Sequence, residues 1–261
     1  MPTASVLAGT NLTIPPVARN IFSSVSSIAN NDFDDIFAHP ATPVSAAELQ
    51  EFKTYLATIP FNFHDHQYTN AGRMLESEGD VRLFLEAAAV LPCWAVALSM
   101  VPASGRSFDL QLRSEKTWKG IAPDLSVFSS HADKTFSPLM AIEFKGPGVL
   151  SVCENGIPSG DCDAWDGVTA QLRKYACENG FKHIVVIDSA HALYFHFNEP
   201  ANEHAEVRYI LASVGDSMVN FTPTVTAREL ILFAFFTCIG EISQRRLVPF
   251  SRLRYLISED S

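Results

Sequence analysis

The chain has 261 residues, of which 47% are hydrophobic and 18% charged, which argues against global disorder and favours one large domain or one domain with an appendage. Its formal net charge of −10 disfavours a general polyanion binder, because long-range repulsion would oppose the approach of phosphate. The charge is still compatible with a local basic patch, or with an acidic site that binds cations first.

The number and spacing of the cysteines, together with the N-terminal sequence, predict a soluble intracellular protein, cytoplasmic or nuclear. Three cysteines lie in apolar or helical segments typical of core thiols: Cys93, Cys177 and Cys238. Cys153 and Cys162 could pair across a loop, but an odd total of five without a CxxC motif indicates a reducing compartment. The N-terminus lacks a signal-peptide pattern, and the apolar run 230–240 is too short to span a bilayer.

The first part of the chain differs in composition from the rest. Residues 1–45 are rich in Ser, Ala, Thr and Pro, and we expect them to form an N-terminal arm on a single domain that spans 46–261. A helix is predicted directly after the arm, because Ser45 can cap it and Glu48 completes a capping box. This helix should end before Pro60.

Residues 70–91 predict a second helix, because one stripe of side chains recurs at steps of three and four residues. The stripe consists of Met74, Glu78, Val81, Leu85 and Ala88. Glu78 is the carboxylate on this otherwise apolar face, and Glu76 is the competing candidate for an acidic residue upstream of the predicted strands.

The remaining elements predict an α/β fold. Four apolar segments predict neighbouring strands: 93–101, 107–113, 121–128 and 139–145. Their short links favour antiparallel pairs. After a Gly-rich loop come a helix at 168–180, strands at 183–189, 192–198 and 206–214, and a helix at 226–245. This order predicts a mixed central β-sheet flanked by helices, with N- and C-terminal helical additions and a parallel neighbour reached through helix 168–180.

Charged residues in two predicted strands need an explanation, because burying an unpaired charge costs several kcal/mol. Asp124 begins one strand, and Glu143 and Lys145 lie two apart on the next, so the latter two share a face. Phe144 points to the opposite face. Carboxylates that converge at one end of a sheet, together with Glu78, cannot stay close and ionised without a cation. Mg²⁺ prefers such a set, and Lys145 could orient a water molecule or offset negative charge.

The pattern Pro-Asp at 123–124 followed by Glu-Phe-Lys at 143–145 resembles the PD-(D/E)XK nuclease superfamily. Gln171 and Tyr175, four apart on the next helix, resemble the QxxxY motif of its RecB-like group. The resemblance covers roughly 70–200, about half of the chain, and is greatest to eukaryotic members, including fungal ones. It implies a restriction-endonuclease-like αβββαβ core.

The resemblance further implies a nuclease, a hydrolase of phosphodiester bonds that uses Mg²⁺ or Mn²⁺, with DNA favoured over RNA. The implied metal ligands are Glu78, Asp124, Glu143 and the carbonyl oxygen of Phe144. The implied catalytic residues are Asp124, Glu143, Lys145, Gln171 and Tyr175. Lys145 would position and activate the attacking water, and the last two side chains would lean over the site.

Other polar residues are weaker candidates. Four basic side chains are candidates for substrate contact: Lys119, Lys174, Arg245 and Arg246. The two arginines could equally lie on a charged face that packs on the domain. His183, His191 and His196 flank the late strands, as either strand-end residues or substrate contacts. The polar segments 64–66 and 161–166 lack the ligand spacing of a zinc or calcium site, so loops are predicted there.

Each motif also has a structural explanation that requires no chemistry. Asp124 could cap a turn after Pro123, and Glu143 with Lys145 could form a surface ion pair worth less than about 1 kcal/mol. Gln171 and Tyr175 could be ordinary helix residues. The alternative function is therefore a catalytically silent nuclease-fold module that binds nucleic acid or a protein partner.

Overall fold

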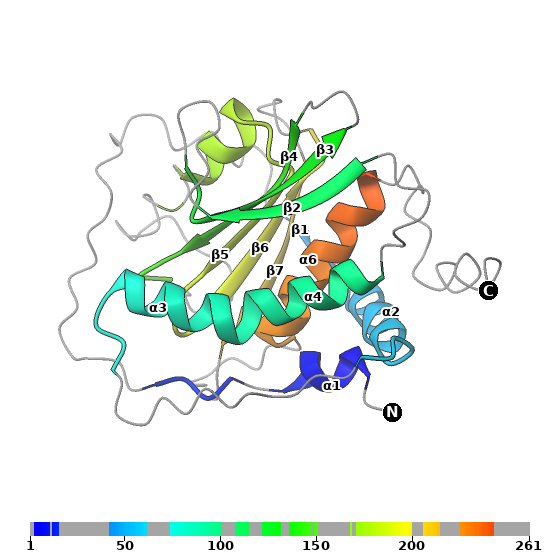
Figure 1. The fold of residues 1–261 in the computed structure, drawn as a ribbon, viewed down its shortest axis with the longest axis horizontal. Helices are drawn as coiled ribbons and strands as arrows, with labels where there is room; N and C mark the ends of the chain where they lie inside the picture. Colours follow the sequence, from blue (N-terminus) through cyan, green and yellow to red (C-terminus); the bar gives the residue numbers. More distant parts are fainter. Residues whose placement is uncertain are drawn as a thin grey trace.

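A mixed β-sheet forms the centre of the structure (Figure 1). The computed structural model describes residues 3–10, 12–15, 42–61, 74–100, 108–114, 122–131, 136–147, 149–150, 168, 171–199, 206–214 and 225–242. Within these ranges the sheet has seven strands in the order β1-β7-β6-β5-β4-β3-β2. The strands are β1 (Thr42–Pro43), β2 (Phe108–Ser114), β3 (Leu125–His131), β4 (Phe136–Phe144), β5 (His183–Ile187), β6 (His191–Phe197) and β7 (Val207–Ser213).

The strand directions agree with those predicted from the lengths of the connections. β2, β3 and β4 pair antiparallel, as do β5, β6 and β7. β4 and β5 pair parallel, and the chain between them includes the predicted helix, described at 171–178. The expected α/β fold with a mixed sheet flanked by helices is therefore confirmed.

Side-chain caps determine where three helices begin. The described helices are α1 (Ala4–Gly9), α2 (Ala46–Leu56), α3 (Glu78–Leu85), the π-turn η1 (Glu86–Val90), α4 (Leu91–Ser99), the π-turn η2 (Lys174–Glu178) and α6 (Ala227–Ile242). Ser45 accepts a hydrogen bond from the N–H of Glu48 at 3.2 Å, which confirms the predicted cap. The Glu48 carboxylate, which was predicted to complete a capping box, pairs with Arg208. Reciprocal capping boxes start α3, through Ser77 and Asp80, and α6, through Thr226 and Glu229.

Two predictions for this part of the chain are wrong. The helix predicted at 70–91 begins later, because the Ser77 capping box fixes its first residue at Glu78. Residues 93–101 were predicted to be a strand, but the helix continues through η1 into α4 as far as Ser99. A run of apolar residues fits a buried helix as well as a buried strand, so its pattern alone does not distinguish the two.

The sheet separates two hydrophobic cores. One core packs α1, α2, α3, α4 and α6 against one face, and the other packs the helix of residues 171–178 against the opposite face (Figure 1). Successive residues of β4 point to opposite faces of the sheet, so they pack in different cores. Ile142 and Phe144 belong to the first core, and Ala141 belongs to the second. Glu143 therefore points to the same side as Ala141.

The continuous helix Glu78–Ser99, with 22 residues, is long and apolar enough to cross a membrane by length and composition alone. A core helix meets the same criteria, and this one packs against α6, with Val81, Leu85 and Cys93 fully buried. The feature is therefore weak evidence for a membrane span.

Arg228 bonds to this helix at the π-turn η1, where Pro92 interrupts the helical hydrogen bonds. Pro92 has no N–H, so it cannot donate the helical bond that the carbonyl of Ala88 would normally accept. The guanidinium of Arg228 occupies that role, since its Nε and Nη2 lie 3.0 and 2.7 Å from the Ala88 oxygen. Its Nη1 also reaches the Leu7 carbonyl at 3.5 Å, which connects α6, η1 and α1.

We expect Arg228→Met to lower the free energy of unfolding by about 2 kcal/mol, because the half-buried Ala88 carbonyl loses its charged donors. In a Pro92→Ala background the loss should be smaller, since the new N–H can bond to the same oxygen. Urea unfolding of the four proteins measures this coupling. Lys53→Met, which removes the partly exposed ion pair with Glu229, is the control and should cost less than about 1 kcal/mol. An equal loss of unfolding free energy in both backgrounds would show that Arg228 does not replace the missing Pro92 N–H at the Ala88 carbonyl.

Candidate functional site

The register of β3 and β4 brings the predicted acidic residues together. In this antiparallel pair Leu125 lies opposite Ile142, so the start of β3 lies beside the end of β4. Asp124, which directly precedes β3, therefore lies next to Glu143 and Phe144. Its Oδ2 accepts a hydrogen bond from the N–H of Phe144 at 2.8 Å.

Glu143 lies at the centre of a hydrogen-bonded network. Its Oε1 accepts bonds from Lys145 Nζ at 2.9 Å and from Gln171 Nε2 at 3.0 Å, and its Oε2 accepts a bond from the Tyr175 hydroxyl at 2.7 Å. The lysine comes from the residue after β4, whereas the other two donors come from the helix of residues 171–178. Glu143 is only 7% exposed, so these donors replace water around its carboxylate.

The first turn of α3 supplies the third carboxylate. Glu78 interacts electrostatically with Lys145 and Glu143, and it accepts a backbone hydrogen bond from Gly146. Burial, with the nearby Glu143 charge, raises the pKa of Glu78, and the positive charge of Lys145 opposes this shift. Glu76 and Glu78 are both exposed, and the backbone N–H of Glu76 is bonded to Asp80. Of the two candidates, Glu78 is the one beside the other carboxylates.

The remaining predicted residues have different placements. The side chain of Phe144 is fully buried in the first core, and its backbone reaches the site through the bond to Asp124. Lys174 is half-buried in the η2 turn, one residue before Tyr175. Lys119, Arg245 and Arg246 lie outside the described residues, as do Cys153, Cys162 and the polar segments 64–66 and 161–166.

Arg82 belongs to the cluster, and the sequence prediction did not include it. Its Nη1 lies 3.2 Å from Oδ1 of Asp124, and its Nη2 donates to the hydroxyl of Ser114 on β2 at 2.7 Å. The signal was its position four residues after Glu78, because residues at this spacing lie on the same side of a helix. Arg82 therefore connects α3 to β2 and to the start of β3.

The electrostatics of the site reflect crowding of like charges. Burial, followed by the charge of Glu143, raises the pKa of Asp124 from 3.8 to about 6, against the opposing effects of the Phe144 N–H and Arg82. Burial and the same neighbouring carboxylate raise the pKa of the Tyr175 hydroxyl well above its ordinary value, so this group remains a donor. The basic side chains at the site therefore neutralise only part of its negative charge.

The donor set fits a hard divalent cation. A carboxylate has about four acceptor positions. Among the described residues, Asp124 uses two of them, one on each oxygen, and Glu143 uses three. Both carboxylates therefore keep acceptor positions, and oxygen ligands of this kind are those that Mg²⁺ and Mn²⁺ take. A bound cation would relieve the repulsion that raises the pKa of Asp124.

Comparisons with models of known protein families, with curated proteins and with solved structures give no match. A functional assignment therefore depends on the chemistry of the site.

We expect Glu143→Gln to lower the pKa of Asp124 from about 6 toward 3.8, without reaching it, because the neighbouring charge is lost while burial remains. Carboxyl-carbon NMR titration in metal-free buffer measures the change. Since the native pKa is raised, the Asp124 contribution to stability falls as the pH rises from about 4 to about 6, and this fall should shrink in the variant.

Glu48→Gln is the control for this titration. Glu48 forms an ion pair with Arg208 on β7, away from the β3–β4 pair in the strand order. Its replacement should leave the Asp124 titration unchanged. An Asp124 pKa that is the same in Glu143→Gln as in the parent protein would show that the two carboxylates are not coupled.

Proposed function

We propose that this chain is a metal-dependent nuclease that hydrolyses phosphodiester bonds in DNA, or in RNA, through a PD-(D/E)XK-type site. The observation that carries the proposal is the convergence of Asp124, Glu143 and Lys145 at one rim of the sheet, with Glu78 beside them. The element order α3, β2, β3, β4, helix, β5 supports an αβββαβ core of the kind that the sequence resemblance implies.

In this proposal Asp124 and Glu143 hold Mg²⁺ or Mn²⁺, with Glu78 and the carbonyl oxygen of Phe144 as further ligands. A cation bound there would polarise the phosphoryl oxygens and lower the pKa of a bound water. The protein contributes preorganisation, because donors from two different elements hold Glu143 before any ligand arrives.

Lys145 and the helix of residues 171–178 have distinct roles in the proposal. The Lys145 ammonium, 2.9 Å from Glu143, supplies a positive charge that can orient the attacking water and offset charge that develops on the phosphoryl group. Gln171 and Tyr175 fix the orientation of the Glu143 carboxylate. Their replacement should therefore weaken metal binding through misplacement of the ligand.

The electrostatics suggest that cation binding precedes substrate binding. The chain has a net charge of −10, so a phosphate backbone is repelled overall. A divalent cation would neutralise two of the three carboxylate charges, and Lys145, Arg82 and Lys174 would then make the local charge positive. Lys119, Arg245 and Arg246 remain candidates for substrate contact from the sequence pattern.

One observation favours the alternative, a catalytically silent module that binds nucleic acid or a protein partner. Arg82 pairs with Asp124 and Lys145 pairs with Glu143, so two of the three carboxylates have basic partners without a cation. In such a module these ion pairs would maintain the fold, and the acidic cluster would have no catalytic role.

Incubation of the purified chain with labelled DNA and RNA, in Mg²⁺ or Mn²⁺, distinguishes the two functions. We expect metal-dependent cleavage that EDTA abolishes and that falls at least a hundredfold in Lys145→Ala and in Asp124→Asn. Lys53→Ala is the matched control, because Lys53 pairs with Glu229 of α6 and should not affect cleavage. Binding of nucleic acid without cleavage would favour the silent module. Cleavage that survives EDTA or Lys145→Ala would overturn the proposed site.

Arg82 should oppose metal binding, because its guanidinium lies 3.2 Å from a proposed ligand atom of Asp124. We expect Arg82→Gln to tighten Mn²⁺ binding about tenfold, through removal of one positive charge beside the cation. Titration calorimetry with Mn²⁺ measures the change. Arg208→Gln removes a comparable ion pair with Glu48 and should leave Mn²⁺ affinity unchanged. Weaker Mn²⁺ binding in Arg82→Gln would mean that Arg82 supports the site.

A further inference from the structure

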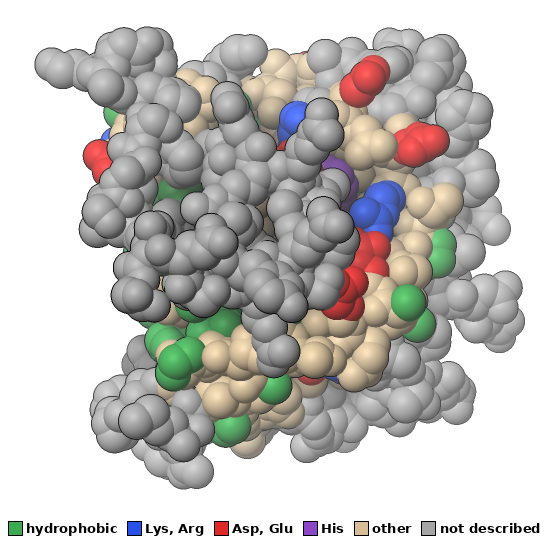
Figure 2. Space-filling view, turned by 90° about the vertical axis from the view of Figure 1, so that its right-hand side faces the viewer, with side chains coloured by type: hydrophobic (Ala, Val, Ile, Leu, Met, Phe, Trp, Pro, Cys, Tyr) green, Lys and Arg blue, Asp and Glu red, His purple; other side chains and the backbone are tan. Residues whose placement is uncertain are grey.

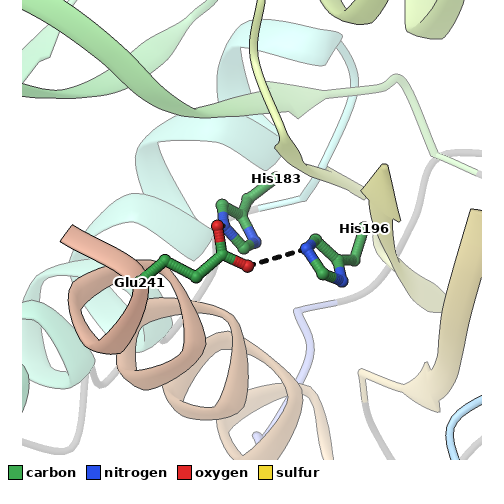
Figure 3. Close-up of side chains that lie close together, drawn as sticks. All are labelled: His183, His196 and Glu241. Atoms are coloured by element: carbon green, nitrogen blue, oxygen red, sulfur yellow. Dashed lines mark ion pairs between the residues drawn. The ribbon is translucent and has the colours of Figure 1, made fainter. Parts of the chain in front are cut away.

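A second group of metal-ligating side chains lies on the opposite face of the sheet. It consists of His183 at the start of β5, His196 near the end of β6 and Glu241 in the last turn of α6 (Figure 3). His183 pairs in register with Met140, at the other end of the β4–β5 pair from Phe144. The group is therefore separate from the carboxylate site.

The β5–β6 hairpin places the two imidazoles side by side. His183 lies directly opposite His196 in the antiparallel register, so both side chains leave the sheet on the same face. The turn is fixed by Asp188, whose Oδ1 accepts bonds from the N–H groups of Ala190 and His191, both at 2.7 Å. The imidazole rings lie 4.8 Å apart between centroids, with an interplanar angle of 4°.

α6 crosses this face and brings a carboxylate to both rings. Oε1 of Glu241 lies 2.8 Å from His196 Nε2, and Oε2 lies 3.4 Å from His183 Nε2 (Figure 3). One ligand atom from each residue falls within 4.8 Å of the others. The α6 end lies on the right-hand side of Figure 1, and the face viewed from there carries histidine, basic and acidic side chains next to one another (Figure 2).

We infer that His183, His196 and Glu241 form a binding site for Zn²⁺ or a similar late divalent transition metal. Two imidazole nitrogens and one carboxylate oxygen are a known protein ligand set for zinc that leaves a fourth position open. Imidazole also selects such metals over Mg²⁺, which prefers oxygen ligands alone. The two sites of this chain therefore differ in ligand chemistry, so they should take different metals.

Metal binding requires a local adjustment, because the three ligand atoms now span up to 4.8 Å. Ligand atoms about 2 Å from a tetrahedral zinc lie about 3.3 Å from one another. The His196–Glu241 contact must lengthen slightly, and the parallel rings must turn about their Cβ–Cγ bonds, which are soft torsions. Lys182 Nζ, 3.6 Å from Glu241, lies on a side chain that is 48% exposed, so it can move into solvent.

The surroundings orient the ligand residues before a metal binds. Tyr194, which is fully buried, places its hydroxyl 2.8 Å from Nδ1 of His183 and so directs Nε2 toward Glu241. His183 and His196 are 2% and 6% exposed, whereas the Glu241 side chain is 22% exposed. The metal would therefore connect the end of α6 to the β5–β6 hairpin, and its binding should stabilise the fold.

Co²⁺ absorption of the tag-free full chain tests the inference, because a tetrahedral cobalt site has visible bands. We expect one equivalent of Co²⁺ to give these bands, Zn²⁺ to remove them and excess Mg²⁺ to leave them intact. The bands should persist in Glu143→Gln, which alters only the carboxylate site, and in His191→Gln, a control on the same hairpin. They should be lost in His196→Gln and in Glu241→Gln.

Thermal unfolding gives a second measurement. Zn²⁺ at a hundredfold excess over its Kd should raise the Tm of the parent protein by about 5 °C and leave the Tm of Glu241→Gln unchanged. Glu241→Gln keeps the side-chain shape at a partly exposed position, so this variant provides the test if His196→Gln fails to fold.

The inference would be overturned by absent cobalt bands, by bands that persist in Glu241→Gln, or by bands that disappear in Glu143→Gln. Nuclease activity affects none of these outcomes.

Discussion

The register between β3 and β4 is the constraint on which the candidate site depends. Pairing Leu125 with Ile142 places Asp124 against the backbone of Phe144, one residue from Glu143. Because side chains alternate along a strand, the same register sends Phe144 into the core and Glu143 toward the opposite helix. A shift by one residue would exchange these two, burying a carboxylate in the larger core and removing it from its donors.

The cluster also has a thermodynamic cost. The carboxylates gather where burial weakens hydration, and the raised pKa of Asp124 reflects this penalty. Arg82 and Lys145 reduce it by direct ion pairing, and Tyr175 remains protonated and donates to Glu143. Functional sites commonly concentrate such unfavourable charge, and the extensive apolar packing on both sheet faces provides the compensating stability.

Most of the correct predictions from the sequence rested on patterns among residues close together in the chain. Caps such as Ser45, alternation around Glu143 and the four-residue step from Gln171 to Tyr175 depend on neighbours in sequence, so they could be interpreted without a structure. The strand prediction at 93–101 failed because its environment, burial against α6, is a tertiary property. The pairing of His183 with His196 could have been inferred from hairpin symmetry, but nothing local indicates that Glu241 lies beside them.

The π-turn η1 divides one long helix into two parts with different orientations about its axis. The upstream part, α3, presents Glu78 and Arg82 to the carboxylate cluster, whereas the downstream part, α4, buries Cys93 and Val96. Each residue of an α-helix turns the chain by about 100°. Deletion of a single residue within Glu86–Val90 would thus rotate α3 away from the cluster while α4 stays packed. The alignment of Glu78 and Arg82 with the cluster therefore depends on the number of residues in this turn.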